Sequence, residues 1–285
     1  MPWGLVLNGG GAKGAYQIGV WKYLLERSVY FDYISGTSAG ALNAVLMGYS
    51  DFERAYNIWT TLSLSRTMKL DPIKALRHVR IMAGELVKIL ALKKLQGVKI
   101  ALGIMAIIKG GGNLLTVFEE GLVSIEPLVT LIDNNIDYYN YPERPVVYIT
   151  TVRNHPLYIF QDKCYFNFTE AHPLIKRKLL LATSAIPLLF PSTDIGNIRY
   201  SDGGIPYVGD NNPIFPIYKR RCEHIVAIHL KTRCKSNKRH YPASRIIDVV
   251  PSKDLGSMLK FDGKHAERLI SLGYEDSHKQ LKEVF

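Results

Sequence analysis

Cysteine is scarce in this chain of 285 residues, which contains three of them, Cys164, Cys222 and Cys234. An odd number of cysteines without a recurring spacing matches neither a disulfide framework nor a metal site. Reduced thiols are typical of cytoplasmic proteins. We therefore expect a cytoplasmic location and neither a metal nor another cofactor.

A long uncharged hydrophobic run is missing as well. The longest one in the middle of the chain, Ile100–Ile108, lies between two lysines and is far too short to span a bilayer. The start of the sequence, MPWGLVLNGGGAKG, has no charged leader and breaks into glycines, unlike a signal peptide. These absences predict a soluble protein, which can still make peripheral contact with a membrane.

Acidic residues are the third shortage, because 25 Asp and Glu stand against 36 Lys and Arg, for a net charge of +11. The basic excess is concentrated in residues 66–112 and 219–245. Such stretches indicate an anionic partner: a phospholipid surface, a nucleotide or a nucleic acid. No nucleic-acid recognition motif accompanies the charge, so a nucleic-acid-binding module is the least favoured of these.

The first fifty residues alternate between strand and helix. Gly4–Leu7 is a short apolar run that leads into a glycine-rich loop, and residues 15–27 then have helical spacing. Asp32–Ser35 is a second short strand, followed by a second helical segment. This alternation predicts an α/β protein with a parallel sheet. Further strands are expected at Pro145–Val152, Leu157–Gln161, Tyr165–Thr169, Ile198–Ser201, His224–Leu230 and Ile246–Val250.

Helical spacing dominates residues 51–133 and returns twice later in the chain. A basic amphipathic stretch lies at about residues 80–108, where apolar side chains interleave with lysines such as Lys88, Lys93 and Lys94. Two interpretations stay open for it: a helix that lies in an anionic lipid interface, or a cap helix that packs its apolar face on the domain. The expected helices are Asp51–Leu62, Asp71–Arg80, Ala83–Leu95, Gly97–Ile108, His172–Ser184 and Lys264–Val284.

One serine lies in the sequence Gly36-Thr37-Ser38-Ala39-Gly40. The pattern G-x-S-x-G is that of a nucleophile elbow, a sharp strand-to-helix turn that exposes the serine hydroxyl. Small residues such as Gly36 and Gly40 are needed beside the serine because the chain approaches itself closely in this strained turn. Ser38 is therefore the candidate nucleophile.

The loop after the first strand consists of Gly9, Gly10, Gly11, Ala12, Lys13 and Gly14. Its backbone N–H groups precede a helix and can face an anion. Three interpretations stay open: a dinucleotide site, an oxyanion hole, or a tight turn without a ligand. Against the dinucleotide site, the first acidic residues after the loop, Glu26 and Asp32, do not end a second strand as a ribose-binding acid should.

A nucleophilic serine needs a base, and Asp202 is the candidate. It ends an expected strand and precedes Gly203 and Gly204, which let a neighbouring group approach closely. The alternative is an ordinary Asp-Gly turn. A carboxylate base should be ionised well below neutral pH unless its pocket raises its pKa. The histidines expected to be packed or solvated rather than catalytic are His155, His172, His224 and His229.

The glycine loop, the serine elbow and the Asp-Gly-Gly sequence, in this order, resemble the patatin-like phospholipases of the bacterial type. The segments LATSAIPLLFP (181–191), DNNPIFP (210–216) and residues 249–276 resemble that family as well. The resemblance covers nearly the whole chain except the helical stretch at about 62–125.

This resemblance implies a three-layer α/β/α sandwich with a mostly parallel central sheet and a helical cap inserted at about 62–125. The catalytic motifs would lie in residues 5–207, and residues 208–285 would complete the same domain. Because the sequence has no internal repeat and no long linker, we expect a single domain over 1–285. An oligomeric state is not indicated.

The resemblance also assigns roles to the motif residues. Ser38 and Asp202 would form a Ser–Asp dyad, with Ser38 as the nucleophile and Asp202 as the general base. Backbone N–H groups of the loop Gly9–Gly14, chiefly those of Gly10–Ala12, would hold the oxyanion together with the N–H of Ala39.

The expected function is that of a serine lipid acyl hydrolase of the phospholipase A or lysophospholipase type. Its substrate would be a phospholipid or lysophospholipid ester, and its partner an anionic membrane surface. One alternative is the same hydrolase acting as a ligand-gated bacterial effector, for example one activated by a cyclic nucleotide. A nucleic-acid-binding module is a distant third.

Overall fold

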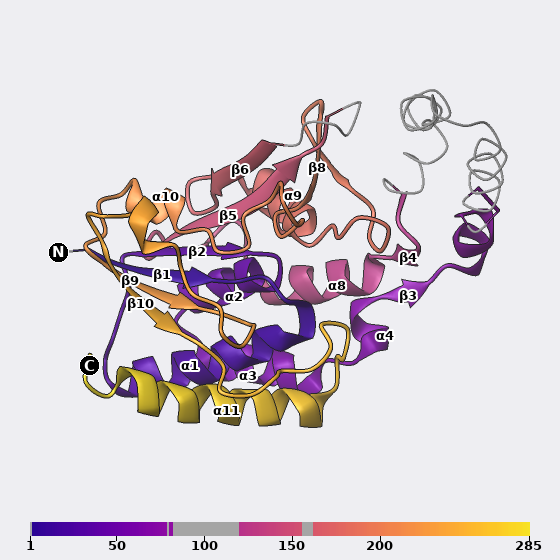
Figure 1. Ribbon diagram of the computed structural model, residues 1–285. Helices are drawn as coiled ribbons and strands as arrows, with labels where there is room; N and C mark the ends of the chain where they lie inside the picture. Colours follow the sequence, from indigo (N-terminus) through magenta and orange to yellow (C-terminus); the bar gives the residue numbers. More distant parts are fainter. Residues whose placement is uncertain (1, 79, 82–119, 156–161) are drawn as a thin grey trace, which may run out of the picture.

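A central sheet organises the chain, of which the computed structural model describes residues 2–78, 80–81, 120–155 and 162–285. The strand order is β10-β9-β1-β2-β5-β8-β7, and β6 pairs with β5 (Figure 1). All neighbours from β10 to β5 are parallel, whereas β6, β7 and β8 are antiparallel to their partners. The prediction of an α/β fold with a mostly parallel sheet is confirmed. The strands are β1 (Trp3–Leu7), β2 (Tyr33–Thr37), β5 (Val146–Arg153), β6 (Asp162–Asn167), β7 (Thr193–Ile195), β8 (Ile198–Asp202), β9 (His224–Ile228) and β10 (Arg245–Val249).

Helices cover the two faces of the sheet unequally. Side chains along β1 alternate between the faces, so that Leu5 and Leu7 belong to the larger core cluster and Val6 to a smaller one. The larger core packs against α1 (Ala15–Glu26), α2 (Ala39–Gly48), α3 (Phe52–Thr61), α9 (Pro173–Thr183) and α11 (Gly263–Leu281). The smaller core lies under the short helix α10 (Phe215–Tyr218). Figure 1 shows α1, α3 and α11 on one side of the sheet and α10 on the other.

Close packing joins the two ends of the chain. Helix α1 lies along α11 at Gly19 and Gly273, where any side chain would overlap the backbone of the opposite helix. The hydroxyl of Tyr16 on α1 donates to Asp276 of α11 at 3.1 Å. The closing helix, predicted from its amphipathic spacing, therefore packs against the helix that follows the glycine loop.

The cap region is described only in part. Its described elements are α4 (Leu64–Thr67), a helical turn over 72–78, and the strand pair β3 (Lys69–Leu70) and β4 (Val123–Ser124), which leads into α8 (Glu126–Asn135). The expected helices Ala83–Leu95 and Gly97–Ile108, the lysines among them and the expected strand Leu157–Gln161 lie outside the described residues. None of the helices within the described ranges is both long and apolar enough to cross a membrane.

Candidate active site

Ser38 occupies a strained turn between β2 and α2. Its backbone angles are φ 55° and ψ −127°, a left-handed conformation that is rare for a residue with a side chain. The Ser38 N–H donates to the hydroxyl of Thr183 at 2.9 Å, and that hydroxyl donates to the carbonyl of Thr150 at 2.6 Å. Helix α9 and strand β5 thus hold the turn in place.

The glycine loop lies directly against this turn. Strands β1 and β2 are parallel neighbours, so the loop after β1 and the turn after β2 emerge at the same edge of the sheet. A side-chain carbon at Gly9 would lie 3.1 Å from Cβ of Ser38, and one at Gly40 would lie 2.7 Å from the carbonyl oxygen of Asn8. A side chain at Gly40 would also overlap the carbonyl oxygen of Leu7, so glycine is required there for the loop and the turn to come this close.

The backbone N–H groups of the loop differ in their availability. The N–H of Gly9 donates to Asn211 Oδ1 at 3.1 Å, that of Ala12 to the carbonyl of Met258 at 2.7 Å, and that of Lys13 to the carbonyl of Gly10 at 3.2 Å. Within the described part of the chain, the N–H groups of Gly10, Gly11 and Ala39 donate to no protein acceptor. Of the loop N–H groups expected to hold an oxyanion, those of Gly9, Ala12 and Lys13 are therefore already occupied by protein acceptors.

Asp202 ends β8 and is buried, with 5% of its surface exposed. Its carboxylate accepts the N–H of Gly204 at 2.6 Å. Burial raises the pKa of the Asp202 carboxyl to about 6, although the nearby Ser38 hydroxyl and the Gly204 N–H act in the opposite direction. The sequence predicted a base ionised well below neutral pH unless its pocket raised its pKa. The pocket does raise the pKa of Asp202 toward neutrality.

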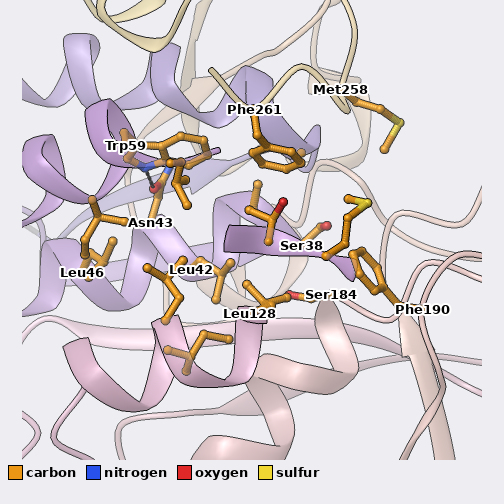
Figure 2. Close-up of a pocket in the computed structure, with 18 of the residues that line it drawn as sticks. Ser38, Leu42, Asn43, Leu46, Trp59, Leu128, Ser184, Phe190, Met258 and Phe261 are labelled. Atoms are coloured by element: carbon orange, nitrogen blue, oxygen red, sulfur yellow. Dashed lines mark hydrogen bonds between the residues drawn. The ribbon is translucent and has the colours of Figure 1, made fainter. Parts of the chain in front are cut away.

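An apolar cavity extends away from Ser38. Leu42 and Leu46 follow Ser38 at intervals of four residues, so one face of α2 runs along the cavity for about 12 Å. Figure 2 shows Ser38 near Phe190 at one side of the cavity and Leu46 at the other. The remaining wall comes from α3, α8, the glycine loop at Gly11, residues 67–68, and the loops around residues 184–190 and 258–261. Its other labelled residues in Figure 2 are Asn43, Trp59, Leu128, Ser184, Met258 and Phe261.

The family model of the patatin-like phospholipases matches residues 5–218. The chain belongs to the patatin-like phospholipase family. The resemblance inferred from the sequence motifs is thereby confirmed. The single-domain organisation over 1–285, including residues 208–285 and the cap at 62–125, stays a prediction.

Individual relatives match this family member over limited lengths or at low identity. Lysophospholipase nte1 of Aspergillus terreus is 56% identical over 43 residues, which is 15% of this chain and 3% of that relative. VipD from Legionella pneumophila has a TM-score of 0.47 at 16% identity, covering 99% of this chain and 67% of its own. The type III effector protein ExoU has a TM-score of 0.45 at 16% identity, covering 99% and 53%. The chain thus spans a very small part of the curated relative and about half of ExoU.

Several polar residues at the patatin-like site were not found from the sequence. Asn43 lies in the cavity wall, where its Oδ1 accepts the indole N–H of Trp59 at 2.8 Å and its Nδ2 donates to the carbonyl of Gly14 at 2.9 Å (Figure 2). Thr183, which holds the elbow, and Asn211, which contacts the glycine loop, lie in the segments 181–191 and 210–216 that resemble the family. The sequence does not indicate that either residue contacts the elbow or the glycine loop.

The histidines expected to be non-catalytic include one that is completely buried. His229 lies 2.8 Å from the carboxylate of Asp248 and 3.2 Å from the side-chain amide of Asn8. These contacts lie beneath the start of the glycine loop and do not include Ser38. His172 caps the start of α9.

The raised pKa of Asp202 predicts a pH-dependent difference in stability between the wild type and Asp202→Asn. The folded-state pKa of about 6 exceeds the ordinary value of 3.8, so the buried carboxylate destabilises the fold above pH 6, and this cost disappears toward pH 4. Chemical denaturation at pH 7 should find Asp202→Asn more stable by on the order of 2–3 kcal/mol. This advantage should shrink steadily as the pH is lowered to 4.

The matched control for this experiment is Asp254→Asn, which removes an exposed carboxylate. Its difference from the wild type should not follow the same pH dependence. A constant difference between the wild type and Asp202→Asn from pH 7 to pH 4 would contradict the raised pKa.

Proposed function

We propose that this patatin-like chain is a serine lipid acyl hydrolase that cleaves carboxylic ester bonds of phospholipids or lysophospholipids. The observation that carries the proposal is the pairing of a strained Ser38 with a buried Asp202 at one end of an apolar cavity. Ligand gating of the same hydrolase and nucleic-acid binding stay predictions from the sequence.

In the first half of the proposed reaction, Ser38 is the nucleophile and ionised Asp202 the general base. The Ser38 Oγ attacks the ester carbonyl carbon while its proton passes to Asp202. The carbonyl oxygen becomes negative, and the unoccupied N–H groups of Gly10 and Gly11 supply hydrogen bonds to it. The intermediate then collapses, the ester bond breaks, and the departing alcohol takes the proton from Asp202.

In the second half, water replaces the alcohol. Asp202, again ionised, removes a proton from the water as the water oxygen attacks the acyl carbon bound to Ser38. The same backbone donors stabilise the second oxyanion. Collapse releases a fatty acid and returns the proton to Ser38 Oγ. Both halves therefore use the same base and the same donors.

The apolar cavity supports a fatty acyl chain as the group transferred to Ser38. Its wall offers apolar side chains along α2, α3 and α8 and few polar groups, as is typical of a site for an apolar ligand. Seating a chain there places its carbonyl end at the turn, where the donors are. The local similarity to a protein named lysophospholipase agrees with such a substrate.

The exposed residues in the described part of the cap favour an anionic membrane surface as the partner. Leu64, Leu70, Ile73 and Leu76 are large apolar side chains there that are about half or more exposed to solvent. Exposed basic residues lie among them or just after them in sequence, namely Arg66, Lys69, Arg77 and Arg80, of which Arg77 forms an ion pair with Glu120. Thr67 and Met68 of the same segment line the cavity. We infer that this segment contacts the lipid interface beside the entrance for the substrate.

Removing either member of the dyad tests the reaction. Ser38→Ala and Asp202→Asn should each lower kcat for a p-nitrophenyl ester by at least about 10,000-fold, because nucleophile and base act as a unit. In the wild type, kcat/KM should fall as the pH drops through about 6, since protonated Asp202 cannot act as a base. The dyad is wrong if Asp202→Asn, shown to be folded, keeps wild-type turnover or the wild-type pH profile.

Shortening the cavity tests the acyl-chain site. Leu46→Trp fills the end away from Ser38, so it should reduce hydrolysis of a p-nitrophenyl palmitate relative to a butyrate by roughly tenfold or more. The control is Leu174→Trp, which adds the same bulk at an exposed position on α9. An unchanged ratio of the two kcat/KM values in Leu46→Trp would mean that the chain lies elsewhere.

Charge reversal tests the membrane contact. Arg66→Glu combined with Lys69→Glu should slow hydrolysis of phosphatidylglycerol vesicles by roughly 30-fold or more, because each basic residue at an anionic surface contributes about 1 kcal/mol. Hydrolysis of p-nitrophenyl butyrate should stay near the wild-type rate. The control is Lys279→Glu combined with Lys282→Glu at the far end of α11, which changes the net charge equally. Equal vesicle rates in the two double variants would rule out this docking surface.

A further inference from the structure

One short segment, Asp210–Pro213, contacts both the elbow strand and the acid motif. The N–H of Asp210 donates to the carbonyl of Gly203 at 2.7 Å, beside the candidate base. The hydroxyl of Thr37 donates to the carbonyl of Asp210 at 2.7 Å, and that of Ser35 to the carbonyl of Pro213 at 2.6 Å. The segment is therefore a brace between β2 and the end of β8.

From this brace, Asn211 reaches the glycine loop. Its Oδ1 accepts the N–H of Gly9 at 3.1 Å, and its Nδ2 donates to the carbonyl of the same residue at 3.2 Å. A single side chain thus satisfies both backbone polar groups of Gly9. These two hydrogen bonds also fix which end of the amide is oxygen, because the reverse orientation would place donor against donor and acceptor against acceptor.

The second of these hydrogen bonds determines where the next N–H points. The carbonyl of Gly9 and the N–H of Gly10 belong to one planar trans peptide, in which the two groups point in opposite directions. Holding the carbonyl toward Asn211 therefore directs the Gly10 N–H to the other side. Glycine on both sides of this peptide removes the steric barriers that would otherwise set its orientation, so the side-chain contact has to supply the constraint.

Asn211 also lies close to the candidate base. A carbon placed on Gly204 would be 2.9 Å from Asn211 Oδ1 and 3.1 Å from Asp202 Oδ1, so these two oxygens are within about 6 Å of each other, a range in which opposite or like charges act strongly. A neutral amide satisfies the glycine loop without placing a second negative charge beside Asp202. This explains why an asparagine suits the position better than an aspartate of the same shape.

We propose that Asn211 is a positioning residue of the hydrolase, which orients the Gly9–Gly10 peptide so that the Gly10 N–H serves as an oxyanion donor. This inference rests on the proposed hydrolysis by Ser38 and Asp202. The side chain of Asn211 acts through the backbone of the loop, and its loss weakens transition-state stabilisation more than substrate binding.

The first test compares Asn211→Ala with Asn212→Ala in hydrolysis of p-nitrophenyl butyrate. Asn212 is a matched control because its side-chain amide donates to the hydroxyl of Ser236 at 3.0 Å and, within the described residues, forms no hydrogen bond to any of the three motifs. Asn211→Ala should lower kcat about 10- to 100-fold with KM little changed, as expected when a catalytic group is misplaced. Asn212→Ala should keep kcat near the wild-type value even if its thermal unfolding temperature falls.

The second test uses Asn211→Asp, which has the same shape and still accepts the N–H of Gly9. It cannot donate to the Gly9 carbonyl, so kcat should again fall. The new negative charge beside Asp202 should also move the acid limb of the pH–rate profile to higher pH, by about one unit. The shift of the limb reports the new charge near Asp202, whereas the fall in kcat on the plateau above the limb reports the lost hydrogen bond to the Gly9 carbonyl. A residue that only stabilised the fold would leave the plateau kcat at the wild-type value. If Asn211→Ala does not fold, this variant decides the question.

The outcomes separate this inference from the function on which it rests. Wild-type protein that hydrolyses no ester, or a fully active Ser38→Ala, would overturn the proposed function and the role of Asn211 with it. A wild type that depends on Ser38 and Asp202, together with an Asn211→Ala as active as Asn212→Ala, would overturn only the positioning role. So would an Asn211→Asp whose kcat on the plateau equals the wild-type value.

Discussion

Burial of the Asp202 carboxylate is the constraint on which the rest of the site depends. A carboxylate removed from water favours its neutral form, and here the N–H of Gly204 and the hydroxyl of Ser38 offset this tendency only in part. The residual effect is a pKa of about 6, which makes the group a stronger base than an exposed aspartate while leaving it ionised at neutral pH. An ionised carboxylate in this position lowers the free energy of unfolding, and interactions elsewhere in the protein have to compensate for that loss.

Several contacts define the geometry of the site. The elbow is a strained turn, and Thr183 anchors its backbone N–H to α9. The glycine loop has little intrinsic preference for one conformation, and Asn211 binds it from the other side. A turn and a loop that would be poorly determined alone are therefore each tied to an element that is remote in the sequence.

The cavity gives the site its apolar character. The serine at the start of α2 and the leucines one and two turns later share a face of that helix, so the reacting atom and the wall of the cavity belong to one rigid element. Asn43 on the same helix links Trp59 to the carbonyl of Gly14 by hydrogen bonds. The position of the wall is thus coupled to that of the glycine loop.

Local patterns in the sequence were sufficient for the strands and helices of the first fifty residues, the glycine loop and the turn at Ser38, because each depends on residues close together in the chain. The parallel sheet followed from the alternation of strands and helices. The same patterns did not separate α8 from the helical stretch 51–133, and they gave no indication of the antiparallel pairing of β8 with β5 or of which loop N–H groups are already occupied. The contacts of Asn211 with Gly9 and of Met258 with Ala12 join residues from opposite ends of the chain. The raised pKa of Asp202 depends on how completely the surrounding elements exclude water. Only the tertiary structure decides such features, because desolvation and long-range hydrogen bonding are properties of the packed chain and not of any short segment.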